Sequence, residues 1–289
     1  MARIEVNQAG LMTTLQDKGR QGLAFFAIPA SGPLDAGAAR TANLLVGNAA
    51  DATVLECNFV PPVLKFHHPA DIGLAGADMY WRVDGVLVQR DCTVSVAAGS
   101  ILSGQPAQHG SRGYIAVAGH ISTECSFGST ACYPLAAWGG NTGRPLRRGD
   151  SILWQPTAVS WRVNLIMPAA STSAAALEII RGPEFEYLAG AAKRRIVTAS
   201  FCITPDSNRM GARLEGPQLT IRQRLVDSVP VLPGMIQLLP SGQCIAVLQD
   251  GQSTGGYPRI AYLPSPALRR FNQLRVHEPF RLQLIGHAN

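Results

Sequence analysis

The sequence is short of charged and aromatic residues, and this scarcity narrows the kinds of protein it can be. Charged residues make up 15% of its 289 residues and aromatic residues 7%, whereas an average soluble domain has roughly 25% charged residues. Hydrophobic residues make up 46%, enough to bury a large core, so the composition excludes a disordered chain. No apolar run approaches the roughly 18 residues of a transmembrane helix, and the first residues lack the apolar core of a signal peptide. We therefore expect a cytoplasmic protein with no membrane association.

Lysine is also rare, and the positive charge is not clustered. The formal net charge is +6, but the chain has three lysines and no run of arginines longer than two. A nucleic-acid-binding surface usually shows a basic stripe or a recognisable module. We expect no nucleic-acid partner.

Several cofactor and nucleotide motifs are absent. The six cysteines form no Cys-x-x-Cys pair and no paired Cys/His spacing of a zinc site, and there is no His-Glu-x-x-His sequence. No two glycines are separated by a single residue, which excludes the Rossmann fingerprint, and no Gly-Lys-Ser/Thr sequence is present. The sequence therefore predicts no metal site, and any ATP would be bound without a P-loop.

Glycine and proline are abundant, at 29 and 20 residues, or about 17% of the chain against an average near 12%. Between these turn-forming residues lie short runs with alternating or β-branched apolar residues, typical of strands in hairpins, barrels or sandwiches. Such runs are Ile4–Val6, Val63–Phe66, Tyr80–Val83, Val86–Val88, Thr93–Val96, Tyr114–Val117, Trp161–Ile166, Leu177–Ile180, Met235–Leu239, Ile245–Leu248, Ile260–Leu263 and Phe280–Ile285. The pattern predicts a mainly β protein.

Three segments favour short helices instead. Apolar residues recur at helical spacing after Asp35 until Gly47 and Asn48 interrupt them. Ser265 and Pro266 resemble an N-cap followed by a first-turn proline. A third helix could follow Pro183.

A stretch of small, uncharged residues from Met167 to Ala176 resembles a linker. We place the boundary between two β-rich domains there, with a first domain of residues 1–168 and a second of residues 177–289.

Polar residues gather in glycine-containing loops, and these are the candidate site residues. In the first half they are Asp17 and Arg20, after the first strand, and Asp35, at the start of the first helix. Each has a structural explanation as well, since Asp35 could cap the helix and Arg20 could pair with a carboxylate.

In the second half, one loop carries Asn208, Arg209 and Arg213, and a second loop follows Leu248. The second loop is about ten residues long, whereas the loop of an ordinary hairpin has two to five residues. Its polar and glycine residues suit contact with a small planar ligand, and they include Asp250, Gln252, Thr254, Gly255, Gly256 and Tyr257.

At these residues the chain resembles the biotin-dependent carboxyltransferase family, whose bacterial members include allophanate hydrolase subunit 2, KipA and the C-type component of 5-oxoprolinase. The resemblance runs through six segments in order along nearly the whole chain: Thr14–Arg20, Ser31–Asp35, Ala42–Asn48, Arg112–Gly119, Asn208–Leu214 and Asp250–Pro258. Two positions depart from the family pattern, since Ser253 stands where Thr is usual and His120 where a second Gly is usual.

The resemblance implies a pair of cyclophilin-like open β-barrels. It also implies an enzyme subunit that is inactive alone and works with a B-type partner protein (KipI or allophanate hydrolase subunit 1), and in 5-oxoprolinase with an A-type partner protein as well. That hetero-oligomeric assembly hydrolyses 5-oxo-L-proline to L-glutamate at the expense of ATP. The sequence from Asp250 to Pro258 favours this oxoprolinase type over the fused urea amidolyases.

Two alternatives remain open. One is a biotin-dependent carboxyltransferase, of the allophanate hydrolase subunit 2 or urea amidolyase kind, that acts on a urea-like amide. The other is a KipA-like regulatory protein that binds a kinase-inhibitor partner.

Both enzymatic reactions act on a small-molecule amide. Both require polarisation of its carbonyl group and transfer of a proton at its nitrogen. We expect Asp250 to be a general base or an amide-orienting carboxylate, and Asn208 to bond the substrate carbonyl or ureido group. Arg209 or Arg213 would anchor a substrate carboxylate or phosphate, and the residues from Gln252 to Tyr257 would line the pocket. Asp17, Arg20 and Asp35 are secondary candidates.

Overall fold

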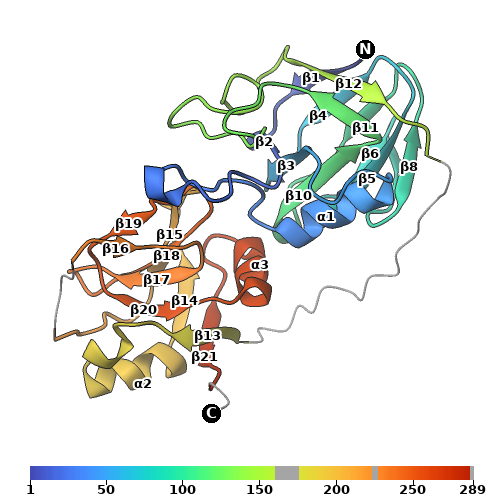
Figure 1. Cartoon of the computed structure of the whole chain (residues 1–289). Helices are drawn as coiled ribbons and strands as arrows, with labels where there is room; N and C mark the ends of the chain where they lie inside the picture. The colour runs from blue at the N-terminus through green and yellow to red at the C-terminus, as the bar shows by residue number, and fades with distance from the viewer. Residues whose placement is uncertain (160–175, 223–226, 287–289) are drawn as a thin grey trace. The chain divides into compact units, whose positions relative to one another are not determined.

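A computed structural model describes residues 1–159, 176–222 and 227–286, and within these ranges the chain forms two compact units (Figure 1). The first unit holds residues 1–21 and the described chain from residue 31 to 159. The second holds Gly22–Ala30 together with the described chain from residue 176 onward. The second unit therefore includes a segment from near the N-terminus, which nothing in the sequence pattern indicated.

The first unit is built from two antiparallel sheets. The seven-stranded sheet has the order β11 (Gly119–Ser122), β12 (Ser151–Pro156), β1 (Ala2–Gln8), β4 (Val63–Phe66), β9 (Ile101–Ser103), β6 (Arg82–Val83) and β7 (Val86–Leu87). The five-stranded sheet has the order β2 (Met12–Gln16), β3 (Val54–Asn58), β10 (His109–Val117), β5 (Ala70–Asp78) and β8 (Thr93–Val96).

Strand β10 contributes side chains to two cores, because successive residues of a strand point to opposite faces of the sheet. Ile115 and Val117 point into the core shared by both sheets, whereas Tyr114 and Ala116 point to the opposite face and pack against α1 (Ala36–Leu45). Helix α1 covers that face closely: a Cβ atom at Gly73 of β5 would lie 2.1 Å from the Ala42 carbonyl oxygen. Glycine is thus needed at position 73 for the helix to approach the sheet.

The second unit is a closed barrel of seven strands. Its order is β13 (Leu177–Arg181), β20 (Arg259–Tyr262), β17 (Met235–Leu238), β18 (Cys244–Val247), β15 (Gly211–Glu215), β14 (Ser200–Ile203) and β21 (Phe280–Leu284). Helices α2 (Gly190–Thr198) and α3 (Ser265–Gln273), the 3₁₀ turns η1 (Ala24–Phe26) and η2 (Phe185–Tyr187), and a two-stranded ribbon of β16 (Val229–Pro230) and β19 (Thr254–Gly255) complete the unit.

The mainly β fold class is confirmed. The barrel of the second unit is closed, however, where the resemblance implies an open one. It closes because β21 pairs in parallel with β13 on one side and antiparallel with β14 on the other, which leaves no free edge. Among the described residues, no helix has the length and apolar character needed to cross a bilayer.

The predicted elements are largely found, with local differences. Helix α1 begins after Asp35 as predicted, but α3 has Pro264 at the N-cap and Ser265 inside the helix. The segment after Pro183 forms only the short turn η2. The predicted strand Trp161–Ile166 and the predicted domain boundary from Met167 onward lie outside the described residues, apart from Ala176.

Candidate functional site

The two polar loops of the second unit lie against each other. The backbone N–H of Leu248 donates to the Met210 carbonyl, and that of Asp250 to the Arg209 carbonyl, each at 3.0 Å. A Cβ atom at Gly251 would lie 2.8 Å from the Met210 oxygen, so the absence of a side chain allows this close approach. The fold therefore brings together the two segments that the sequence singled out.

Arg209 and Asp250 form a buried ion pair at this junction. Nε of Arg209 donates to Asp250 Oδ2 at 2.8 Å and Nη2 donates to Oδ1 at 3.2 Å, and the two side chains are 6% and 3% exposed. The planar guanidinium matches the carboxylate in a two-point contact, which fixes the orientation of both groups. Both oxygens of Asp250 are thus engaged by Arg209.

Asn208 directly precedes Arg209 in the chain, Arg213 follows it on β15, and both residues are exposed. Oδ1 of Asn208 accepts from the backbone N–H groups of Met210 and Gly211, at 2.8 and 3.3 Å. This use of the side-chain oxygen stabilises the turn and leaves the amide Nδ2 as the group that can donate to a ligand. Arg213 lies on β15, where its backbone N–H donates to Ser207 Oγ at 3.0 Å.

The loop after Leu248 is partly regular. Thr254 and Gly255 form β19 and pair with Pro230 and Val229 of β16. A Cβ atom at Gly255 would lie 3.0 Å from Nε2 of Gln237 and 3.1 Å from Nε2 of Gln252. The glycine therefore leaves room for two side-chain amides at one spot.

Gln237 is a residue that the sequence analysis missed. It lies on β17, is 1% exposed, and donates from Nε2 to the Tyr257 carbonyl at 3.3 Å. In the sequence it is one polar residue within an apolar strand, so no local signal marked it. Tyr257 and Gly256 are half-buried and Thr254 is exposed.

A second missed pair, Glu184 and Arg259, supports the same ribbon. Glu184 Oε2 accepts from the backbone N–H and Nε of Arg259, and Oε1 accepts from Nη2 at 2.8 Å. Burial opposes ionisation of the Glu184 carboxyl, but its hydrogen bonds to Arg259 outweigh that effect and hold its pKa below the usual range. Nη1 of Arg259 also donates to the Pro230 carbonyl of β16.

Asp17 and Arg20 both bind one loop of the first unit. Asp17 accepts from Ser129 Oγ and from the Thr130 backbone N–H, while Nη2 of Arg20 donates to the Ala131 carbonyl at 2.6 Å. Arg20 is 2% exposed and lies over the Trp138 ring. These contacts give both residues a structural role in holding residues 129–131.

Asp35 belongs to a separate buried network of the first unit. Its carboxylate caps α1 by accepting from the Ala38 backbone N–H at 3.0 Å. Its own backbone N–H donates to the Tyr114 hydroxyl, which in turn donates to Glu56 Oε2, both at 2.8 Å. Burial, followed by the nearby Glu56 and Asp35 carboxylates, raises the pKa of Tyr114 well above its usual value. Tyr114 is therefore neutral and donates to Glu56.

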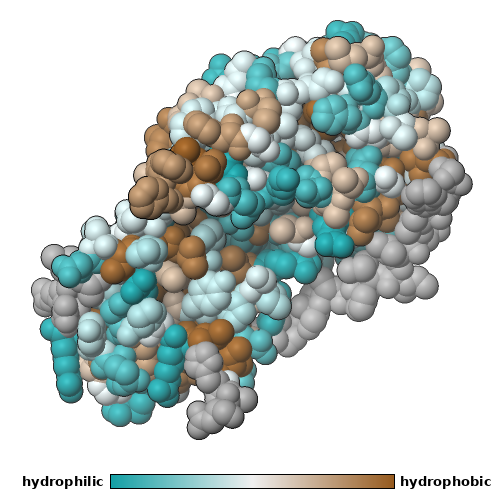
Figure 2. Space-filling view, in the orientation of Figure 1, coloured by the Kyte–Doolittle hydropathy of each residue, from teal (hydrophilic) through white to brown (hydrophobic). Residues whose placement is uncertain are grey.

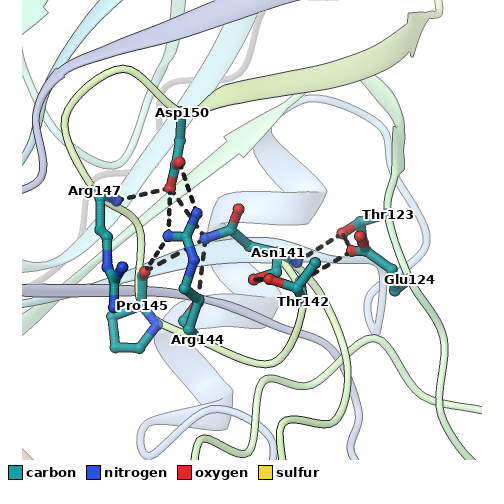
Figure 3. A network of polar contacts seen from close by, with 8 residues as sticks. All are labelled: Thr123, Glu124, Asn141, Thr142, Arg144, Pro145, Arg147 and Asp150. Atoms are coloured by element: carbon teal, nitrogen blue, oxygen red, sulfur yellow. Dashed lines mark hydrogen bonds and ion pairs between the residues drawn. The ribbon is translucent and has the colours of Figure 1, made fainter.

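A third network holds the connection between β11 and β12 (Figure 3). Arg144 donates from Nη1 and Nη2 to the two oxygens of Asp150, both at 2.8 Å, and the Arg147 N–H and Asn141 Nδ2 also bind this carboxylate. The hydrogen bonds from Arg144 are the main cause that lowers the pKa of Asp150 to about 2. These contacts are internal to the loop and stabilise its fold.

The candidate residues thus form separate groups. Arg209, Asp250, Asn208 and the ribbon residues lie in the second unit, whereas Asp17, Arg20 and Asp35 lie in the first. Among these groups, only the one in the second unit combines a buried ion pair, exposed polar side chains and a glycine beside which two side-chain amides meet. We take it as the candidate site.

Comparison with known proteins agrees with the motifs. Residues 26–284 match the family model described as carboxyltransferase domain, subdomain A and B. The chain is 34% identical over 279 residues to the C subunit of 5-oxoprolinase from Escherichia coli (strain K12), covering 96% of this chain and 89% of that protein. It is 28% identical over 294 residues to urea amidolyase of Saccharomyces cerevisiae, covering 94% of this chain but 16% of that protein.

Among solved structures, the crystal structure of the K. lactis urea amidolyase matches with a TM-score of 0.91 at 24% identity, over 98% of this chain. That likeness shows the fold. The chain spans 19% of that solved chain and 55% of another that it matches.

Proposed function

The chain belongs to the family of the carboxyltransferase domain, subdomains A and B, and from this premise we propose that it is the C-type component of a heteromeric ATP-dependent 5-oxoprolinase. In this assembly 5-oxo-L-proline is hydrolysed to L-glutamate with the help of an A-type and a B-type partner protein. The observation that carries the proposal is the 34% identity to the C subunit of a 5-oxoprolinase over 96% of this chain and 89% of that protein.

The candidate site offers the polar groups that such a reaction needs. Hydrolysis of a cyclic amide requires donors to the carbonyl oxygen as negative charge develops there. Asn208 Nδ2 is an exposed donor beside Arg209, and Gln237 and Gln252 direct two further amides toward Gly255. We assign the substrate carbonyl to Asn208 and the substrate carboxylate to Arg213.

The geometry favours one of the two roles expected for Asp250. A general base must come within hydrogen-bond distance of the substrate proton, whereas the Asp250 side chain is 3% exposed and directs both oxygens at Arg209. Asp250 acts in this proposal as the carboxylate that orients Arg209 and, through its backbone, joins the two loops. Gln252, Thr254, Gly256 and Tyr257 would line the substrate pocket.

ATP enters the proposal through the assembled complex. The sequence contains no Gly-Lys-Ser/Thr, so this chain would contact ATP without a P-loop, or a partner protein would bind it. Exposed hydrophobic side chains support the expectation of a partner: Figure 2 shows them gathered over η1, where Phe25 and Phe26 are 93% and 68% exposed. Apolar patches of this kind are typical of protein interfaces.

The second candidate is a biotin-dependent carboxyltransferase that acts on a urea-like amide. The family model and the 28% identity to yeast urea amidolyase favour it. In that case carboxybiotin on a carrier, rather than ATP at this complex, would supply the reactive group.

Co-expression with the A-type and B-type partner proteins of the same genome tests the proposal. We expect glutamate to be released from 5-oxo-L-proline only when ATP and all three chains are present, and avidin to have no effect. The matched control omits this chain alone. A folded three-chain complex without glutamate release would contradict the proposal, and carboxylation of urea that avidin abolishes would support the second candidate.

A further inference from the structure

Three potential metal ligands lie close together in the second unit, and none of them is a residue that we assign to the proposed reaction. Cys202 lies on β14, Glu215 lies directly opposite it on β15, and His277 lies in the turn between α3 and β21. One ligand atom from each, a sulfur, a carboxylate oxygen and an imidazole nitrogen, lies within 4.8 Å of the other two. The residues are 13 and 62 positions apart in sequence, so no spacing motif could reveal them.

The strand pairing sets the distance between two of the ligands. Sγ of Cys202 lies 3.6 Å from Glu215 Oε2. In a tetrahedral zinc site, with Zn–S near 2.3 Å and Zn–O near 2.1 Å, sulfur and oxygen ligands are about 3.6 Å apart. The cross-strand pair therefore already has the separation that a shared Zn²⁺ ion requires.

The turn that carries His277 is held in place by the backbone. The His277 N–H donates to the Ile203 carbonyl at 3.0 Å, and Val276 forms a parallel bridge with Ile203. His277 has a φ of 64°, an uncommon conformation for a residue with a side chain. The Arg275 N–H donates to Glu278 Oε2 at 3.0 Å, which stabilises the turn and so fixes His277 beside residue 202.

The donor set selects the type of ion. A thiolate and an imidazole favour zinc over the hard cations magnesium and calcium, and zinc also accepts a carboxylate oxygen as a ligand. Cys202 is half-buried and Glu215 and His277 are exposed, so an ion could enter from solvent. Three protein ligands leave a fourth tetrahedral position for water.

We propose that Cys202, Glu215 and His277 form a binding site for a single Zn²⁺ ion, which links β14, β15 and the turn before β21. This site is independent of the proposed 5-oxoprolinase activity. Binding would release the Cys202 proton, because the ion coordinates the thiolate.

Titration of the purified full-length chain with Co²⁺, followed by competition with Zn²⁺, tests the site. We expect one Co²⁺ per chain, with a thiolate-to-cobalt charge-transfer absorption that Zn²⁺ removes. Zn²⁺ should also protect Cys202 from alkylation by iodoacetamide, as measured by mass spectrometry of the peptides.

Substitutions separate a built site from surface adsorption. Cys202→Ser should abolish the charge-transfer band, and Glu215→Gln and His277→Asn should each weaken Zn²⁺ binding about 10-fold or more. Asn tolerates the positive φ of position 277, so His277→Asn removes the imidazole without straining the turn. The matched control is Cys92→Ser, because Cys92 is also half-buried and lies beside a carboxylate, that of Asp91.

Each result bears on the proposal. Binding that is lost in Cys202→Ser and retained in Cys92→Ser supports it, provided that thermal melting without metal shows both variants folded. Failure of the wild-type chain to bind Co²⁺ or Zn²⁺, binding that is unchanged by all three ligand substitutions, or unaltered alkylation of Cys202 would overturn it.

Discussion

The buried ion pair of Arg209 and Asp250 affects the stability of the chain as well as the proposed chemistry. Removing one partner of a buried ion pair leaves an uncompensated charge inside the protein. The same substitution can therefore reduce activity through the site or through the fold. Experiments on this pair need both readouts.

We predict that Asp250→Ala lowers the free energy of unfolding by about 3–5 kcal/mol, the range found when a buried pair is broken. Urea denaturation of the isolated chain measures this loss. The double variant Arg209→Met with Asp250→Ala should recover part of it, because the guanidinium charge is then absent. A loss below about 1 kcal/mol in the single variant would show that the pair is not buried in solution.

Asn208 allows a separation of structure from function. We predict that Asn208→Asp keeps the stability of the chain, because a carboxylate oxygen can still accept from the Met210 and Gly211 N–H groups. The change removes the Nδ2 donor, so kcat of the assembled complex should fall about 10²-fold, the effect of losing one oxyanion donor. Asn208→Ala is the companion variant and should reduce both properties. Full activity of Asn208→Asp would exclude Nδ2 as the carbonyl donor.

At the scale of elements, predictions from the sequence were most reliable for helices and strands whose apolar residues recur with a single clear period. Thr93–Val96 and α1 followed the two-residue and 3.6-residue periods and were found as expected. Helix α2 was missed because only Ala192 and Ile196 face its core, and Lys and Arg occupy much of the rest. Strand β5 was missed because glycine and alanine obscure its alternation.

The candidate site was predictable only in part, for the same reason. The sequence pattern indicated the two loops that carry Arg209 and Asp250. The ion pair between these side chains, however, joins residues that are 41 positions apart in the sequence. Glu184 and Arg259 are 75 residues apart, and Gln237 is a single polar residue on a buried strand. Local patterns carry no information on such distant partners.

The connection between β11 and β12 gives a prediction of pH dependence. Hydrogen bonds from Arg144 lower the pKa of Asp150 to about 2 in the folded chain, from a reference of 3.8. Because the folded pKa is the lower one, the stabilisation is complete above pH 4 and is lost as the pH falls toward 2. The shift corresponds to about 2 kcal/mol, for a side chain that is 16% exposed.

The measurement compares urea denaturation of the wild-type chain and Asp150→Asn at several pH values. The wild type should be more stable by about 2 kcal/mol near neutral pH, and the difference should narrow below pH 4. A difference that is constant down to pH 3 would contradict a lowered pKa of Asp150.

At the scale of the whole molecule, the reactivity of two buried cysteines can show separately when each of the two units unfolds. Cys57 is buried in the first unit and Cys244 in the second. Burial raises the pKa of the Cys244 thiol to about 12, and it also raises the pKa of the Cys57 thiol. Since the thiolate is the reactive form, neither should react with an alkylating reagent until its own unit opens.

We predict that iodoacetamide at neutral pH modifies the exposed Cys125 first and leaves Cys57 and Cys244 unmodified in the folded chain. Increasing urea should then expose the last two at the midpoint at which each unit unfolds. Peptide mass spectrometry over a urea series measures both midpoints. Rapid modification of Cys57 or Cys244 without urea would contradict the described cores.

The place of Gly22–Ala30 in the second unit has a consequence for synthesis on the ribosome. Ala30 is translated 146 positions before Ala176, where the described chain of that unit resumes. At about 5–20 residues per second, roughly 7–29 s pass between synthesis of this segment and synthesis of the first strand of the barrel. The segment Gly22–Ala30 is thus synthesised long before the rest of the unit in which it folds. The second unit can complete its folding only after most of the protein has been made.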